Sequence, residues 1–217
     1  MKSTLEVTGL SKIYNKKEAV KDISFKVNKN EIIGILGPNG CGKTTTIGMI
    51  LGLLKPSKGK VFINGIEIEK NRVELLNHLN FISPYIELPK KLTVKQNLEV
   101  YGRLYDVKKL KTKIEYISEK LRLTEILNKI TGELSSGQKN RVSLAKSIIN
   151  NPSILLLDEP TASLDPETGD FVRSFLENYQ KENGTSILLA SHNMAEVERL
   201  CSSVLMMNKG FIIEKGN

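Results

Sequence analysis

Apolar residues follow two patterns along the chain, one alternating and one continuous. The segments LEVTGLSKIY (5–14) and DISFKV (22–27) alternate apolar and polar residues, which is typical of strands with one buried face. Three later runs, EIIGILG (31–37), SILLLDE (153–159) and TSILLAS (185–191), are continuously apolar. Such strands are typical of a parallel sheet covered on both faces. Helical segments lie between them, so we expect an α/β fold with a mainly parallel sheet and an N-terminal antiparallel β subdomain.

Helical periodicity replaces the strand pattern in the middle of the chain, as in VKQNLEVYGRLY (94–105) and IEYISEKLRL (114–123). We expect an inserted α-helical subdomain at about residues 85–151. The flanking segments, 1–84 and 152–217, would form the two halves of the sheet-containing core. All 217 residues would then belong to one domain.

Polar groups directly follow each continuous apolar run. A glycine-rich stretch begins at Gly37, Asp158 and Glu159 end the second run, and His192 follows the third. The carboxyl ends of parallel strands meet at one sheet edge, where ligands bind. These groups are therefore expected to share one site.

The stretch GPNGCGKTT (37–45) fits a phosphate-binding loop between a strand and a helix. Its glycines let backbone N–H groups face anionic oxygens, and the helix dipole adds to the attraction. Lys43 is expected to reach the β- and γ-phosphates, and Thr44 to coordinate Mg²⁺. The predicted nucleotide-binding residues here are Gly37, Pro38, Asn39, Gly40, Cys41, Gly42, Lys43, Thr44 and Thr45.

Two acids at the end of a buried strand complete this chemistry. Asp158 is expected to hold Mg²⁺, directly or through water, and Glu159 to polarise or orient an attacking water. Phosphate loop and acid pair together indicate nucleoside triphosphate binding with Mg²⁺ and hydrolysis.

Cys41 lies inside the predicted anion-binding loop, and two interpretations of it stay open. A helix N-terminus and a lysine both lower a thiol pKa, which would make Cys41 reactive. Alternatively, Cys41 is an inert packing residue.

The net charge of +8 and the pI of about 9.3 have two interpretations. The protein binds anionic partners, or its lysines lie on faces exposed to solvent. Two cysteines form no disulfide framework, so a reducing compartment is expected. The apolar runs are too short for a membrane span, so any membrane role must come through a partner.

A second phosphate-binding device is predicted in LSSGQKNRVSLAKSIINNP (134–152). Ser135 and Ser136 can cap a helix beginning near Gly137 or Gln138. That helix end would offer hydroxyl groups, backbone N–H groups and a dipole. One chain has little need of two such devices for one nucleotide.

The segment resembles the signature motif of ATP-binding cassette (ABC) proteins, usually LSGGQ, with Ser136 in place of a glycine. The resemblance covers nearly the whole chain in the family's motif order. It implies that Tyr14 stacks on adenine, that Ser163–Asp165 crosses a dimer interface, and that His192 is the switch histidine. It also implies a head-to-tail dimer in which the signature of one subunit closes over ATP held by the other. The signature contacts would come from Ser135, Ser136, Gly137, Gln138 and, in the crossing loop, Asp165.

The resemblance further implies an ATPase subunit, with Glu159, His192 and Lys43 catalytic, that powers a separate transmembrane permease. The second ABC subunit could be identical or different. The protein is expected in the cytoplasm, peripheral on the inner face of the cell membrane, with no nucleic acid as partner. The overall pattern is more similar to exporter-type subunits than to importers.

One position departs from the family. Its glutamine between the sheet core and the helical lobe, which contributes to the Mg²⁺ site, falls on Pro84 here. Proline lacks the amide, and Ser83 and Tyr85 are the candidates to substitute for it. The missing glutamine leaves open an ATP-gated regulatory dimer with little hydrolysis. The basic charge leaves open a second alternative, a soluble ABC ATPase acting on nucleic acid or ribosomes.

Overall fold

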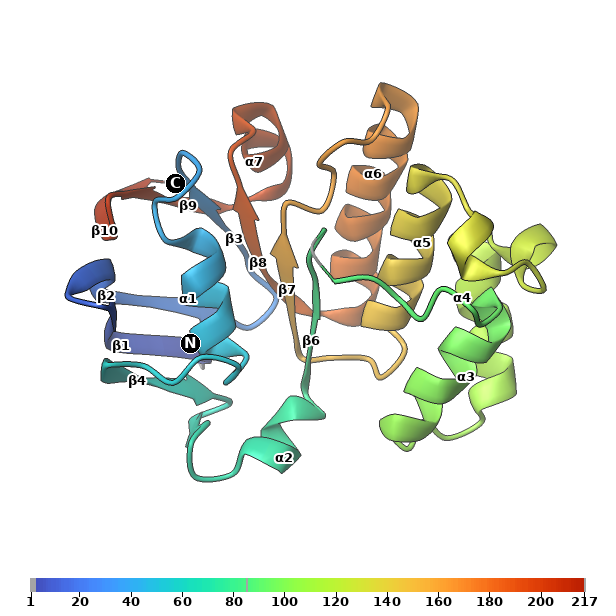
Figure 1. The fold of residues 1–217 in the computed structure, drawn as a ribbon, viewed down its shortest axis with the longest axis horizontal. Coiled ribbons are helices and arrows are strands. Elements are labelled where there is room, and N and C mark those ends of the chain that lie inside the picture. The colour runs from blue at the N-terminus through green and yellow to red at the C-terminus, as the bar shows by residue number, and fades with distance from the viewer. Residues whose placement is uncertain (1–2, 85, 217) are drawn as a thin grey trace.

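Two β-sheets form the frame of the computed structural model, which describes residues 3–84 and 86–216 (Figure 1). The larger sheet has six strands in the order β10-β9-β3-β8-β7-β6. Its strands β3 and β6 to β9 pair in parallel, and β10 closes a hairpin with β9. In chain order these strands are β3 (Ile32–Leu36), β6 (Leu79–Ile82), β7 (Ile154–Asp158), β8 (Ser186–Ser191), β9 (Ser203–Asn208) and β10 (Phe211–Gly216).

The smaller sheet is antiparallel and has the order β2-β1-β4-β5. Its strands are β1 (Ser3–Tyr14), β2 (Lys17–Asn28), β4 (Lys58–Ile63) and β5 (Ile66–Glu67). Alternate residues of β2 are buried, as the alternating sequence predicts. The predicted fold class, a parallel core with an N-terminal antiparallel β subdomain and a helical insertion, is confirmed.

Every residue of β3, β7 and β8 is buried, because both faces of this sheet are covered. Ile154 and Leu156 of β7 join the apolar cluster that contains residues of α1 (Lys43–Ile50). Leu155 and Leu157 point the other way, into the cluster that contains residues of α6 (Pro166–Asn183). This two-sided burial explains the continuous apolar runs.

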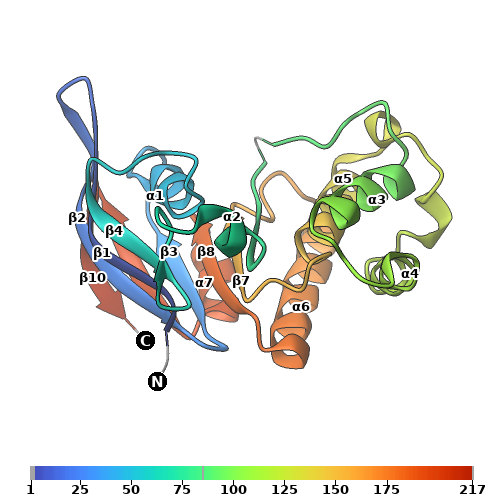
Figure 2. The ribbon, with the colours of Figure 1, turned by 90° about the horizontal axis from the view of Figure 1, so that it is seen from below.

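Two groups of helices surround these sheets. Outside the segment between β6 and β7, the chain also carries α2 (Arg72–Leu76) and α7 (Met194–Leu200). The chain between β6 and β7 carries α3 (Val94–Leu104), α4 (Leu110–Lys120), α5 (Ser136–Ser147) and the short 3-10 turns η1 (Thr124–Ile126) and η2 (Thr131–Glu133). Figure 2 shows α3, α4 and α5 together on one side, away from the antiparallel sheet. Tyr85, the expected edge of the insertion, lies outside the described residues.

Within residues 3–84 and 86–216, none of the helices combines the length and the apolar composition that crossing a membrane requires.

Candidate functional site

The loop between β3 and α1 depends on glycine at two positions. A Cβ at Gly37 would lie 2.2 Å from the carbonyl oxygen of Met207. Gly42 has a φ of 114°, and a Cβ there would lie 2.7 Å from the carbonyl oxygen of Ala19. Both residues allow the loop to curl against the neighbouring backbone, so its geometry is built into the sequence.

Lys43, the first residue of α1, has its ammonium group folded back over this loop. Its Nζ donates to the carbonyl oxygens of Gly37 at 2.6 Å and Pro38 at 3.4 Å. The same nitrogen lies 3.6 Å from Oε1 of Glu159, which accepts no hydrogen bond from residues 3–84 and 86–216. A phosphate arriving in the loop would therefore meet a positive charge that is already in place.

Thr44 and Asp158 meet across 114 positions of sequence. Thr44 Oγ1 donates to Asp158 Oδ2 at 2.9 Å, whereas Asp158 Oδ1 is buried and has no hydrogen-bond partner among the described residues. Burial raises the pKa of Asp158, and the hydrogen bond from Thr44 opposes that rise. A hydroxyl group beside a carboxylate with one unsatisfied oxygen fits a hard divalent cation such as Mg²⁺.

Glu159 and His192 form the third contact of the site. His192 Nδ1 lies 2.8 Å from Glu159 Oε2, although the histidine side chain is 56% exposed and that of Glu159 only 13%. The backbone of Glu159 has a φ of 52°, in the left-handed region, and its N–H donates to the carbonyl oxygen of Ala190 in β8. Non-glycine residues held in this region are frequent at functional sites.

A cavity of about 290 Å³ joins Lys43, Thr44, Asp158 and Glu159, whereas His192 is not among its lining residues. It is lined by Ala19, Asn39, Gly40, Gly42, Lys43, Thr44, Thr45, Asp158 and Glu159. Most of the predicted phosphate-loop residues and both acids are thus brought together. Ala19 of β2 was missed, because no motif marks a small residue in a distant strand.

Cys41 does not face this cavity. Its side chain is 3% exposed and belongs to the apolar cluster between the two sheets. Its Sγ would lie 2.8 Å from a Cβ placed at Gly37, so it fills the space that the glycine leaves. The structure favours the packing interpretation of Cys41 over the reactive one.

Tyr14 and Asp165 lie apart from the phosphate-loop cavity. Tyr14 ends β1 and is 42% exposed, with Lys12 Nζ 5.0 Å from its ring centroid. Asp165 caps α6 by accepting a hydrogen bond from Thr168 N at 2.9 Å. That bond to the backbone holds the pKa of Asp165 below its usual range.

The signature residues form the N-terminus of α5. Ser135 is the N-cap: its Oγ accepts from Gln138 N at 3.3 Å, and Gln138 Oε1 accepts from Ser135 N at 3.0 Å. This capping box starts the helix at Ser136, slightly before the Gly137 or Gln138 predicted, so Ser136 is not a cap. Ser135 and Ser136 are exposed, and neither they nor Gly137 and Gln138 line the phosphate-loop cavity.

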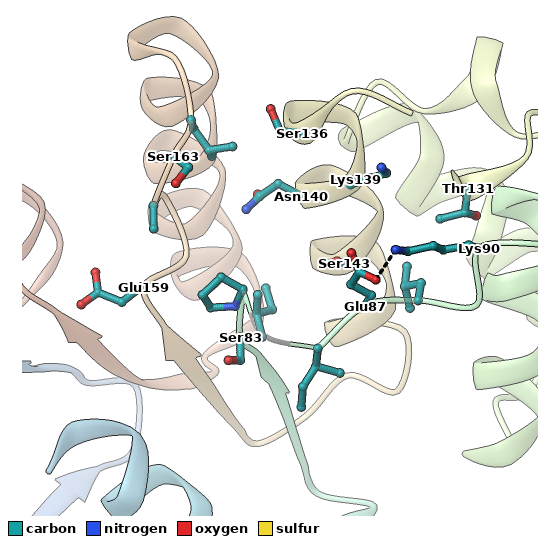
Figure 3. A pocket seen from close by; sticks show the side chains of 16 residues that line it. Ser83, Glu87, Lys90, Thr131, Ser136, Lys139, Asn140, Ser143, Glu159 and Ser163 are labelled. Carbon is teal, nitrogen blue, oxygen red and sulfur yellow. Dashed lines mark ion pairs between the residues drawn. The ribbon is translucent and has the colours of Figure 1, made fainter. Parts of the chain in front are cut away.

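A second cavity, of about 210 Å³, lies between α5, the segment after β6 and the loop after β7 (Figure 3). Pro84, Ser136, Glu159 and Ser163 are among its lining residues. Asn140 points from α5 toward the loop after β7 and donates to the carbonyl oxygen of Pro160 at 2.7 Å. This contact, which sequence reasoning missed, ties the signature helix to the loop that follows Glu159.

An anion-binding loop between a parallel strand and a helix, beside a cation-binding carboxylate, defines a P-loop nucleotide-binding protein. The ABC transporter family profile matches residues 20–162. The chain is 37% identical over 202 residues to the ABC transporter ATP-binding protein NatA of Bacillus subtilis, covering 92% of this chain and 82% of that protein. It is 38% identical over 215 residues to the Nod factor export ATP-binding protein I of Rhizobium johnstonii, covering 98% and 68%.

A solved structure of the ATP-binding subunit of an ABC transporter superposes with a TM-score of 0.90 at 27% identity, covering 99% of this chain and 90% of that chain. CbiO1 from Clostridium perfringens, part of an ABC transporter complex, gives 0.87 at 29% identity, covering 100% and 89%. The chain belongs to the ABC transporter family. It is an ATP-binding subunit, an ATPase of the kind that powers transport.

Proposed function

We propose that this chain binds Mg·ATP at the interface of a head-to-tail dimer and powers a separate transmembrane permease. The observation that supports the dimer is that the phosphate loop and the signature, two anion-binding elements, are separate in one chain. Among the described residues, those lining the phosphate-loop cavity include none of Ser135, Ser136, Gly137 and Gln138. The signature of one chain is therefore available to the phosphate loop of a second subunit, identical or different.

Binding starts at the phosphate loop. The backbone of Gly37 to Gly42 holds the phosphate oxygens, and Lys43 exchanges its contacts with Gly37 and Pro38 for the β- and γ-phosphates. Tyr14, exposed at the end of β1, stacks on adenine. The Ser135 hydroxyl and the N-terminus of α5 from the opposing subunit close the γ-phosphate side, and Asp165 approaches across the interface.

Hydrolysis depends on groups at the strand ends. Thr44 and Asp158 hold Mg²⁺, which supplies neutralisation of phosphate charge when bound. Glu159 orients the attacking water. His192 holds the Glu159 carboxylate through the 2.8 Å contact and faces the γ-phosphate from the exposed side. Lys43 and the opposing signature stabilise the charge that develops on the transferred group.

Coupling to transport runs through the cavity beside α5. It joins Glu159 to Pro84 and to the segment leading into the helical lobe, so a change near the γ-phosphate reaches an exposed surface. The permease would dock on that surface and hold the subunit at the inner, cytoplasmic face of the membrane. Similarity to a Nod factor export protein supports an exporter-type complex.

Mixing two inactive variants tests the shared site. Lys43→Ala destroys the phosphate loop and leaves the signature, whereas Gly137→Val destroys the signature and leaves the phosphate loop. Each variant alone should release little phosphate. Random pairing of the two should restore about one quarter of the wild-type rate, because half the dimers have one complete site.

The matched control mixes Lys43→Ala with the double variant Lys43→Ala/Gly137→Val, in which no complete site can form. Recovery in the first mixture and none in the control is the expected result. A Gly137→Val chain that turns over ATP at the wild-type rate on its own would refute the shared site.

A further inference from the structure

A buried carboxylate outside the nucleotide site connects two of its loops. Glu196 lies in the first turn of α7 and is 1% exposed. Its Oε1 accepts a hydrogen bond from Thr161 Oγ1 at 2.7 Å, and its Oε2 accepts one from Ser191 Oγ at 2.8 Å. Both oxygens of one carboxylate therefore accept from hydroxyl groups of two separate segments, the loop after β7 and the end of β8.

The two hydroxyl groups stand beside the catalytic pair. Thr161 follows Glu159 by two residues, at the start of the loop that leads to α6. Ser191 directly precedes His192, and its Oγ also accepts from Asn193 N at 3.0 Å. The Ser191 hydroxyl thus links the residues on both sides of His192. Glu196 connects the backbone that carries Glu159 to the backbone that carries His192.

Burying the Glu196 carboxylate carries a free-energy cost. A carboxylate taken out of water is destabilising unless its oxygens are hydrogen-bonded, and bonds to a charged acceptor are stronger than neutral ones. Meanwhile α7 has other anchors: Asn193 caps it, and Val197 lies against Gly34 of β3. Removing one hydroxyl group would therefore release its loop and leave the helix in place.

We propose that Glu196 is a positioning residue for ATP hydrolysis, which fixes the loops after β7 and β8 so that the 2.8 Å contact between Glu159 and His192 is kept. This inference rests on the proposed roles of Glu159 and His192. It assigns Thr161 and Ser191 the same function as Glu196, because each supplies half of the connection.

The sharpest test replaces one hydroxyl group without changing side-chain volume. Thr161→Val removes the donor to Glu196, and Thr161→Ser keeps it. Thr161→Val should lower kcat about tenfold, as expected for loss of a hydrogen bond to a charged group, with KM for ATP changed less than about twofold. Thr161→Ser should stay within about twofold of wild type on both constants.

Thr185→Val is the matched control. Thr185 is 3% exposed, and its hydroxyl donates to the carbonyl oxygen of Pro152 at 3.1 Å, away from both catalytic loops. Thr185→Val loses one side-chain hydrogen bond, as Thr161→Val does, but kcat should remain at the wild-type value. Urea unfolding of all three variants establishes that each is folded under assay conditions.

A spectroscopic readout separates positioning from general support. The chain has two histidines, so the imidazole resonances of His78 and His192 can be followed separately. Thr161→Val should shift those of His192 and not those of His78, whereas Thr161→Ser and Thr185→Val should shift neither.

A wild-type kcat in Thr161→Val, or a reduced kcat with unchanged His192 resonances, would overturn the positioning role. If that happens while Glu159→Gln still abolishes turnover, the proposed function stands and only this inference is wrong. If Glu159→Gln turns over normally, the proposed function itself is wrong.

Discussion

The phosphate-loop end and the signature end of this molecule differ in how much of their chemistry one chain completes. At the phosphate-loop end, Lys43, Thr44, Asp158, Glu159 and His192 already contact one another within one chain. At the signature end, the side chains of Ser135 and Gln138 bond to each other's backbone N–H in the capping box that starts α5. The phosphate-loop end is assembled within one chain, whereas the signature end is left exposed for a second subunit.

The topology explains this difference. Parallel strands deliver residues distant in sequence to one edge, so β3, β7 and β8 bring their terminal polar groups together. The signature instead begins a helix in the inserted lobe, where Ser135 and Ser136 are exposed. A phosphate-loop end assembled in one chain, together with an exposed signature, is suited to a reaction that requires a second subunit.

Glu159→Gln should have the largest effect on the phosphate-loop end. The amide keeps the shape of the carboxylate but cannot polarise water as a base, so kcat should fall by at least about a hundredfold. ATP binding should persist, because the phosphate loop is untouched. Phosphate release and nucleotide titration measure the two effects, with the exposed Glu133→Gln as control. Turnover within tenfold of wild type would assign the catalytic function to another residue.

Lys146 joins the two regions where α5 meets β6. Its Nζ donates to Asn80 Oδ1 at 3.1 Å and to the carbonyl oxygen of Phe81 at 3.3 Å. It also lies 4.6 Å from the centroid of the Phe81 ring. Burial lowers the pKa of Lys146 from 10.5 to about 8. The connection between the signature helix and the sheet therefore contains a costly buried charge.

Lys146→Met should reveal that cost in the pH dependence of the unfolding free energy. The folded pKa is depressed, so between pH 8 and 10.5 the unfolded chain binds more protons than the folded one, and the stability of the wild type rises with pH. Relative to Lys146→Met, the wild type should gain roughly 2 kcal/mol in unfolding free energy between about pH 8 and pH 10. Urea unfolding measures this gain. The exposed Lys129→Met should show no such difference, and a parallel pH dependence for Lys146→Met would contradict the assignment.

Ser135→Ala and Lys43→Ala sharpen the comparison by separating binding from turnover. Lys43→Ala should weaken ATP binding to a single chain more than about tenfold, since it removes the phosphate-facing charge. Ser135→Ala should leave that affinity within about twofold yet lower turnover about tenfold, with about 1 kcal/mol lost from the helix cap. Nucleotide titration at low protein concentration reports the first effect and phosphate release the second. Equal losses of single-chain affinity would mean that the signature serves its own phosphate loop.

The sequence predicted the parts of the fold whose residues carry one unambiguous pattern. The runs that became β3, β7 and β8 are apolar on both faces, and the phosphate loop has glycine where its backbone requires it. Strand β6 was not foreseen, because Asn80 interrupts its apolar pattern. In the structure Asn80 is buried and donates to the carbonyl oxygen of Lys146 at 3.3 Å and to Asn150 at 3.0 Å.

Polar residues that act through buried contacts could not be predicted either. Glu196 has the sequence context of a solvated helix face, and only its contacts with Thr161 and Ser191 show otherwise. The side-chain direction of Cys41 depends on how the loop packs against Met207 and the core, which a motif does not encode. Sequence motifs identify residues that contact a ligand. Residues that position other side chains are identified only from the structure.

Pro84→Gln should produce the smallest effect and addresses the segment between the two regions. Pro84 is exposed and lines the same cavity as Glu159, so a glutamine there would add an amide oxygen near the predicted Mg²⁺ site. The Mg²⁺ concentration that gives half-maximal turnover should fall about two- to threefold, because an additional oxygen ligand strengthens binding of a hard cation. Exposed Pro89 in the same segment does not line the cavity, so Pro89→Gln should leave the titration unchanged. Superimposable Mg²⁺ titrations for Pro84→Gln and the wild type would mean that the metal is held entirely from the phosphate-loop end.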